Sequence, residues 1–417
     1  MRILIYSYNY HPEMIGIAPL MTDLAEGLVK RGHQVRVVTA MPWYPADKIN
    51  QEYRGKLYLT EEINGVKIQR CYVWIRKKRS FVNRILFELS FVSLSFCQAL
   101  LGWTPDVILL TVPGLSVSVP AAILGWLYHC PIVLNVQDIL PDAAVHVGLL
   151  TNKKLIRIFQ YLEKFAYTQA TKISVITEGF INNLLAKGVN PEKIVAIPNW
   201  VDVNFIRPLP QADNYFRIEH QLADKFVVLY AGNIALTQGL ETLIEAATYL
   251  RHLQEIAIVI VGEKQALANL KLQCEEYGAD NVTLVPFQTR KQLPEMLAAA
   301  NIGLVLQKRN VIGFNMPSKI QVWLASGRPL IASVPLTGTA AEVTEKSGGG
   351  LVVPPEAPEK LAASIEELYF NPPKIKLLAA QGRKYAELNY NFESALAKYE
   401  QVFSSIVKNH PKGNQSK

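Results

Sequence analysis

Residues 225–233 read KFVVLYAGN, in which six apolar residues run directly into a Gly-Asn pair. A short apolar run that stops at a glycine is typical of a buried strand followed by a turn. The sequence after it contains a second glycine, an amphipathic helical pattern and then another apolar run, AIVIVG at 257–262. Strand, helix and strand in this order predict a βαβ unit, so a parallel sheet begins near the middle of the chain.

The same pattern already opens the chain. RILIYSY at 2–8 is followed by a helical stretch at about 18–31, by Gly32 and by the strand-like QVRVVTA at 34–40. Further short apolar runs follow in both halves. They are DVILLTV, PIVLNVQ, KISVIT and KIVAIP in the first half, and VTLVPF, IGLVLQ, PLIAS and GGLVVP in the second.

Two consecutive sets of alternating strands and helices predict an α/β protein of two Rossmann-like, doubly wound parallel-sheet domains. We place the first domain at 1–205, a linker containing PLPQAD at 206–224, and the second domain at 225–390. A helix at 392–408 and a disordered tail at 409–417 complete the prediction. Because open α/β sheets bind ligands at the carboxyl ends of their strands, two such domains facing each other predict a functional cleft.

The bulk composition fits a compact globular protein. The chain has 417 residues, of which 50% are hydrophobic and 19% charged, which excludes extensive disorder. Its formal net charge of +8 favours an anionic partner: a nucleotide, a phospholipid headgroup or a nucleic acid. The four cysteines show no metal-ligand spacing, and the N-terminus lacks the pattern of a signal peptide.

One stretch, 107–137, contains no Asp, Glu, Lys or Arg and is long enough to raise the question of a membrane span. Pro113-Gly114, Pro120 and Pro131 divide it. We therefore predict a strand at 107–112, a helix at 119–128 and a buried strand at 132–136.

Three strand-to-helix turns are able to carry chemistry. Gly16 precedes the first helix, and Gly232 and Gly239 bracket the loop before the helix of the second half. Glycines there allow backbone amides to approach an anion at a helix N-terminus. Neither turn carries GxGxxG or GxxxxGK[ST], which disfavours hydride-transfer enzymes and P-loop NTPases.

The third turn is GFNMPSKIQVWLASGRPLIAS at 313–333. Pro317 suits the first turn of a helix and leaves Ser318 and Lys319 at its amino end. Free amides, a hydroxyl and an ammonium at a helix N-terminus predict a diphosphate site.

Together these segments resemble the retaining glycosyltransferases of the GT-B fold, glycosyltransferase family 4, and most closely the colanic-acid and exopolysaccharide branch. The resemblance is collinear and covers nearly the whole chain. It is carried by YHPEMIGIA, VQDILPDAA, SVITEGFINNLLAKGVNPEKIVAIPNWVD, YAGNIALTQGLETLIEAA, VPFQTRKQLPEMLAAANIGLV, PSKIQVWLASGRPLIAS and SGGGLVVP.

The resemblance implies that the second domain holds a nucleotide sugar, that the first binds the acceptor, and that the final helix packs back on the first. It places Asp138 and Lys319 as catalytic residues, with Asp138 beside the reacting sugar. The implied donor-binding residues are Gly16, Gly232, Asn233, Gln238, Gly239, Gly262, Pro286, Phe287, Gln288, Pro317, Ser318 and Lys319.

The chain departs from the family pattern at three positions. Related enzymes carry two glutamates that correspond to Phe314 and Val322 here. Lys or Arg is also common where this chain has Gln238. We expect transfer to survive, because stabilising the charge on the leaving diphosphate does not require those carboxylates. Their loss should instead change the hydrogen bonds to sugar or ribose hydroxyls.

The segment WIRKKRSFVNRILFELSFVSLSF at 74–96 places basic residues before an apolar helix. Such a pattern fits attachment to an anionic membrane surface, on the side where related enzymes bind lipid-linked acceptors. RNA binding finds no support in any RRM, KH or helix-turn-helix pattern. The residues of this predicted membrane or acceptor surface are Arg76, Lys77, Lys78, Arg79 and Arg84.

We therefore predict a hexosyltransferase-type enzyme that moves a sugar with retention from a UDP- or GDP-sugar. The expected acceptor is a saccharide, such as one linked to polyprenyl diphosphate, in exopolysaccharide, capsule or O-antigen-type biosynthesis. The expected location is the cytoplasmic face of the plasma membrane. No DxD or HExxH element is present, so neither a cofactor nor an obligatory metal is expected. The alternatives are a nucleotide-sugar 2-epimerase of the same fold and a non-catalytic subunit that partners another transferase.

Overall fold

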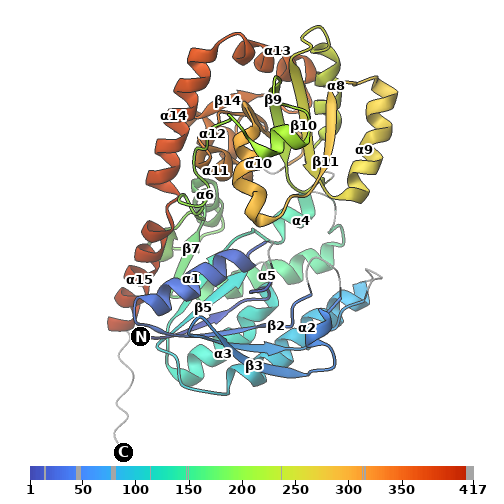
Figure 1. Cartoon of the computed structure of the whole chain (residues 1–417). Coiled ribbons are helices and arrows are strands. Elements are labelled where there is room, and N and C mark those ends of the chain that lie inside the picture. Colours follow the sequence, from blue (N-terminus) through green and yellow to red (C-terminus); the bar gives the residue numbers. More distant parts are fainter. Residues whose placement is uncertain are drawn as a thin grey trace, which may run out of the picture. The chain divides into compact units, whose positions relative to one another are not determined.

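The computed structural model describes residues 1–13, 16–43, 48–76, 81–112, 114–146, 148, 150–235, 237–311, 313 and 316–409. The chain folds into two compact units, each built around one sheet (Figure 1). Unit 1 comprises Met1–Pro198 and the C-terminal residues from Ala395 onward, and unit 2 comprises Asn199–Ser394.

Within the described residues, unit 1 contains an eight-stranded sheet in the order β3-β4-β2-β1-β5-β6-β7-β8. All neighbouring strands are parallel except β3 and β4. The central strands are buried along nearly their whole length, as the continuous apolar runs predict. The strands are β1 (Arg2–Tyr6), β2 (Gln34–Ala40), β3 (Tyr58–Ile63), β4 (Val66–Cys71), β5 (Val107–Val112), β6 (Ile132–Val136), β7 (Lys172–Val175) and β8 (Ile194–Ala196).

Helices cover this sheet. Helix α2 packs against β4 and β2, while α3 packs against β5 and β6 and also contacts α2 and α5. The helices of unit 1 are α1 (Ala18–Lys30), α2 (Phe81–Ala99), α3 (Ser118–Tyr128), α4 (Asp142–His146), α5 (Lys153–Gln169), α6 (Glu178–Ala186) and most of α15 (Phe392–Lys408).

The antiparallel β3–β4 hairpin is absent from the sequence-based prediction. Its signal is an Asn64-Gly65 pair between two alternating strands, and both residues have positive φ angles, +52° and +78°. An Asn-Gly pair with two positive φ angles is typical of a two-residue β-hairpin turn.

Unit 2 contains a fully parallel six-stranded sheet among its described residues, in the order β11-β10-β9-β12-β13-β14. The strands are β9 (Phe226–Ala231), β10 (Ile256–Gly262), β11 (Val282–Pro286), β12 (Ile302–Leu306), β13 (Leu330–Ser333) and β14 (Gly350–Val353). The helices are α7 (Tyr215–Glu219), α8 (Leu240–Tyr249), α9 (Lys264–Tyr277), α10 (Leu293–Ala299), α11 (Ser318–Ala325), α12 (Thr339–Ser347), α13 (Pro358–Tyr369) and α14 (Pro372–Asn389). These two α/β sheets, parallel throughout except for the β3–β4 pair, confirm the predicted fold class.

Residues 206–224, which we interpreted as a linker, lie within unit 2, and the chain passes from one unit to the other at Pro198–Asn199. Phe216 and Leu222 in this segment are buried in an apolar core of unit 2. The Arg217 guanidinium anchors the segment by donating to the Asn301 side chain at 2.6 Å. Loop composition alone did not reveal this apolar anchoring.

The uncharged stretch 107–137 folds as predicted, with β5, α3 and β6 in turn. None of the helices in the described ranges combines the length and apolar character that crossing a bilayer requires. The four cysteines are free thiols.

Candidate active site

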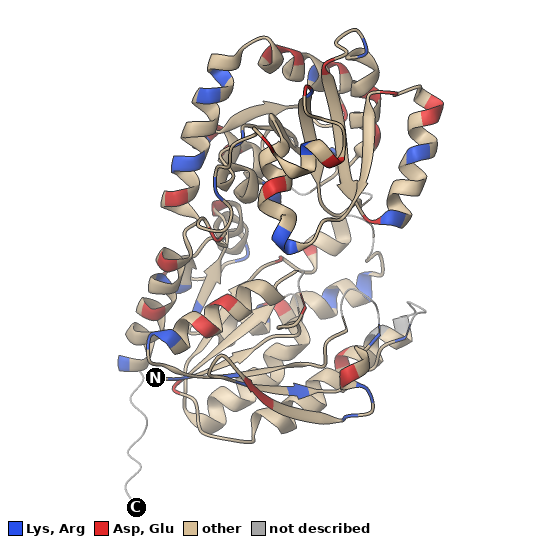
Figure 2. Ribbon diagram, viewed as in Figure 1, with Lys and Arg blue, Asp and Glu red and all other residues tan. Residues whose placement is uncertain are grey.

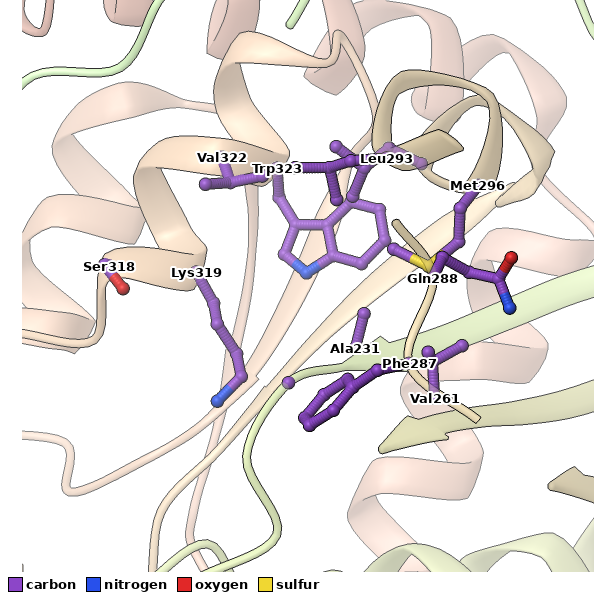
Figure 3. A pocket seen from close by; sticks show the side chains of 12 residues that line it. Ala231, Val261, Phe287, Gln288, Leu293, Met296, Ser318, Lys319, Val322 and Trp323 are labelled. Carbon is purple, nitrogen blue, oxygen red and sulfur yellow. The ribbon is translucent and has the colours of Figure 1, made fainter. Parts of the chain in front are cut away.

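The carboxyl ends of the strands of unit 2 surround a cavity of about 220 Å³ (Figure 3). Parallel strands end at the same edge of a sheet, so the turns after β9, β10 and β11 meet there. Helix α11 adds its first turn. The cavity is lined by Ala231, Gly232, Val261, Phe287, Gln288, Leu293, Met296, Leu297, Ser318, Lys319, Val322 and Trp323.

Lys319 reaches into this cavity from the start of α11 (Figure 3). Its Nζ donates to Oε1 of Gln238 at 3.4 Å and lies 5.0 Å from the centroid of the Tyr230 ring. No carboxylate among the described residues pairs with it. Burial lowers the pKa of Lys319 to about 8, since the ammonium is poorly solvated there. A cation without a fixed counter-ion, facing a cavity, is suited to an anionic ligand.

Gly232 makes room for this lysine. A Cβ atom at position 232 would lie 2.3 Å from the Lys319 Cε, and the φ angle of +140° is one that side chains disfavour. The Gly232 amide donates to the Val261 carbonyl at 3.0 Å, which fixes the backbone against β10. A similar close approach occurs at Gly262, where a Cβ would lie 2.3 Å from the Ile234 Cδ1.

Tyr230 is a site residue that sequence reasoning missed. Its hydroxyl donates to the Asn233 carbonyl at 2.7 Å and lies 3.4 Å from Oε1 of Gln238, while its ring lies under Lys319. Burial raises the pKa of Tyr230, so the phenol stays neutral. The sequence signal that could have indicated Tyr230 is its position one residue before the end of β9, because ligands bind at the carboxyl ends of parallel strands. Gly239, at φ +63°, then begins α8.

The predicted base-binding segment follows β11. The Phe287 amide donates to the Gly262 carbonyl at 2.9 Å, and its ring is 50% exposed. Gln288 donates back to the Pro286 carbonyl at 3.0 Å. Phe287 and Gln288 both line the cavity, whereas Pro286 is not among its lining residues.

The first turn of α11 is open to a ligand. Pro317 has extended backbone before the helix and supplies no side-chain cap, and the Ser318 side chain is exposed. Among the described residues, no side chain caps the backbone amides of this turn. Val322, one turn later, lines the cavity where the resemblance places an acid, and Phe314 lies outside the described residues.

Unit 1 contains a second hollow of about 320 Å³, at the carboxyl ends of its own strands. Asp138, just after β6, lies at its rim: the side chain reaches solvent, yet the surrounding protein raises the pKa of its carboxyl by desolvation. Gly16, also in unit 1, has φ +70° and open space around it. Glu88 of α2 also lines this hollow, although the sequence did not indicate it as a site residue.

Glu13, from the YHPE segment, shapes the wall of this hollow. It is buried, accepts the Trp43 amide at 2.8 Å on one carboxylate oxygen, and accepts the Asn9 side-chain amide at 2.6 Å on the other. These bonds tie the loop after β2 to the loop after β1. Trp43 and Asn9 both line the hollow, so Glu13 positions them.

The structure describes only part of the predicted membrane segment. Lys77, Lys78 and Arg79 lie outside the described residues, and so does the side chain of Arg84. The Arg76 guanidinium lies 4.5 Å from the centroid of the Trp74 ring.

Comparison with known proteins identifies the family. Residues 16–200 match the glycosyl transferase 4-like domain, and residues 212–385 match the glycosyl transferases group 1. WcaI of Escherichia coli (strain K12), assigned as a colanic acid biosynthesis glycosyl transferase, is 32% identical over 96% of this chain and 98% of its own. The protein belongs to the group 1 glycosyltransferases.

Solved structures agree with this fold. Anabaena HepE in complex with UDP superposes with a TM-score of 0.72 at 16% identity, over 97% of this chain and 100% of its own. Sucrose-phosphate synthase of Thermosynechococcus elongatus gives a TM-score of 0.74 at 17% identity, over 98% of this chain and 99% of its own. These structures confirm the predicted GT-B fold, and the family match confirms the predicted glycosyltransferase class.

Proposed function

We propose that this glycosyltransferase moves a sugar, with retention, from a nucleoside-diphosphate sugar to a saccharide acceptor in exopolysaccharide, capsule or O-antigen-type biosynthesis. The observation that carries the donor class is Lys319, a half-buried cation with no paired carboxylate among the described residues, at a helix start without a side-chain cap. Support also comes from HepE, which was solved with UDP, and from WcaI, whose name refers to colanic acid.

In the proposed reaction the bond between the sugar C1 and the diphosphate oxygen breaks, and an acceptor hydroxyl attacks C1 from the same face. The hydroxyl proton passes to the leaving phosphate, so atoms and charge balance. Lys319 and the amides of the first turn of α11 stabilise the negative charge that develops on the diphosphate. Phe287 and Gln288 hold the base, and Asp138 orients sugar hydroxyls in unit 1.

The test is a ligand panel measured by thermal shift and calorimetry. UDP or GDP should stabilise the wild-type protein, and Lys319→Ala should lose most of that stabilisation. Lys271→Ala is the matched control, because its side chain is 72% exposed on α9 of the same unit. Absence of stabilisation by any nucleoside diphosphate would overturn the donor assignment.

Product analysis separates the alternatives. Incubation with a nucleotide-sugar panel and a saccharide acceptor should yield a new α- or β-glycoside whose anomeric configuration matches that of the donor. An isomerised nucleotide sugar would instead indicate a 2-epimerase. Binding without turnover of any donor would indicate a non-catalytic subunit. Activity that persists in EDTA would support the proposal that no metal is obligatory.

We also propose that unit 1 attaches to an anionic membrane through the outer face of α2, α3 and α5, which fits a lipid-linked acceptor. Helix α3 carries no charged residue (Figure 2), and its Trp126 is 76% exposed. Leu89 of α2 and Tyr161 of α5 are 59% and 68% exposed. The exposed cations Lys153, Lys154 and Arg157 also lie on α5.

The acidic side chains of the same helices are withdrawn from this face. Glu88 of α2 binds Tyr8 and Ser116, and Glu163 of α5 is buried against Lys187. Apolar and basic groups therefore dominate the outer face, as interfacial attachment requires.

Trp126→Ser should weaken binding to phosphatidylglycerol-containing vesicles by about tenfold, since one large apolar side chain is lost from the interface. Leu272→Ser, at a 66% exposed position in unit 2, serves as the control. Equal vesicle binding by both variants would contradict this surface.

A further inference from the structure

The hollow of unit 1 has an aromatic wall. The ring of Tyr8 is stacked on Phe87 at 5.6 Å with an interplanar angle of 12°, and Trp43 meets Phe87 edge-on at 5.2 Å. All three residues line the hollow. Aromatic faces offer apolar contact area to the C–H groups of a ligand at little conformational cost. The wall therefore suits a ligand with an apolar face.

This wall is rigid. A Cβ atom at Gly114 would lie 1.9 Å from the Tyr8 ring, so the ring sits directly on a residue without a side chain. Phe91 stacks on Tyr8 at 4.1 Å, and Glu13 fixes the backbone of Trp43. A preformed surface loses little entropy when it binds a ligand.

The charged groups that line the hollow are anionic. Of the lining residues that the structure describes, two are acidic, Glu88 and Asp138, and none is Lys, Arg or His. The hydroxyls of Tyr8 and Ser116 both donate to Oε2 of Glu88. The other oxygen, Oε1, accepts no hydrogen bond from the described residues. An ionised carboxylate has capacity for further donors, such as hydroxyl groups.

We propose that this hollow binds an uncharged, hydroxyl-rich sugar ring of the acceptor and discriminates against acidic sugars. Hydroxyls of the sugar donate to Glu88 Oε1 and to Asp138, while its C–H face packs on the Trp43–Phe87 wall. This inference rests on the proposed transfer to a saccharide acceptor, and it adds the charge class of the acceptor residue. A uronic acid or a phosphosugar would bring a further anion to two carboxylates, and juxtaposed like charges disfavour binding strongly.

The experiment uses the full chain and simple probes. Methyl glucoside, methyl galactoside and methyl mannoside represent neutral sugars, and methyl glucuronide represents the acidic class. Binding is followed by tryptophan fluorescence and by ligand-observed NMR at up to about 100 mM sugar. At least one neutral glycoside should bind about tenfold or more tightly than the glucuronide.

Two conservative variants locate the effect. Glu88→Gln keeps the shape and one oxygen acceptor but removes the charge. It should weaken neutral-sugar binding about tenfold, because a hydrogen bond to a charged acceptor is replaced by a neutral one. Glu88→Gln combined with Asp138→Asn should narrow or reverse the preference against the glucuronide. Glu62→Gln, at an exposed position on β3 of the same unit, is the control and should match the wild type.

The outcomes are separable from those of the nucleotide experiment. Equal or tighter glucuronide binding by the wild type, or no saturable binding of any neutral glycoside, would overturn the inference while nucleotide binding at Lys319 persists. Neutral-sugar binding without any nucleotide binding would instead refute the proposed donor chemistry. Unchanged binding in Glu88→Gln would remove Glu88 from the sugar site.

Discussion

Replacing Lys319 by methionine should stabilise the empty protein and abolish its response to nucleotide. The pKa of Lys319 is lowered from 10.5 to about 8 by burial. Between these values the unfolded chain binds more protons than the folded one, so stability rises with pH through that window. Below pH 8 the full penalty of the buried charge is present. At 1.36 kcal/mol per pKa unit it amounts to an upper limit of about 3 kcal/mol. Methionine has a similar length and no charge, so it removes this penalty.

Differential scanning fluorimetry at pH 7 measures both effects. Unit 2 has about 200 residues, for which 1 kcal/mol corresponds to about 2–4 °C in Tm. Recovery of even a third of the penalty should therefore raise the Tm of the empty variant by about 2–4 °C. Saturating UDP or GDP should raise the Tm of the wild type but not that of Lys319→Met. A variant that is less stable than the wild type and still binds nucleotide would refute the reasoning. Lys271→Met is the matched control.

Three further perturbations test the two sites. Nucleotide affinity should fall about 25-fold between pH 7.5 and 9.5. For a pKa of about 8, the protonated fraction of Lys319 drops from about three quarters to about 3% over this range. A nucleotide affinity that calorimetry finds independent of pH would contradict this. Gly232→Ala should weaken nucleotide binding at least tenfold, since the added Cβ would lie 2.3 Å from the Lys319 Cε. If calorimetry gives this variant the nucleotide affinity of the wild type, the added Cβ does not displace Lys319. Gly114→Ala should displace Tyr8 and reduce methyl glycoside binding while nucleotide binding stays unchanged, and a loss of both would indicate general misfolding instead.

The fold was predictable because its central strands are buried on both faces. Strand β10, IAIVIVG, is buried at every position, so its sequence signal needs no knowledge of distant contacts. The start of α11 was predictable for a related reason, since Pro317 marks a helix entrance locally. The β3–β4 hairpin was missed because one face of β3 is exposed and its alternating pattern differs from that of buried parallel strands.

The walls of both sites were less accessible to sequence reasoning. Glu88 accepts hydrogen bonds from Tyr8 and Ser116, which lie 80 and 28 residues away in the sequence. No local sequence pattern predicts contacts over such separations. In the sequence Tyr230 is an ordinary strand residue, because its contact with Lys319 forms only in the folded protein. The fractional burial that sets the pKa of Lys319 likewise depends on tertiary packing.

Helix α15 completes unit 1 from the far end of the chain. It comes last in the sequence, yet it buries Leu396, Tyr399 and Phe403 in unit 1, and Asn135 of β6 donates to the Tyr399 hydroxyl at 2.6 Å. During synthesis, the apolar surface of unit 1 that α15 covers therefore stays exposed until the whole of unit 2 has emerged. Unit 2 is continuous in sequence and is able to fold before the ribosome releases the chain. We expect a stop codon directly after Ser394, which removes most of α15, to leave unit 2 intact and to make unit 1 a substrate for chaperones and proteases.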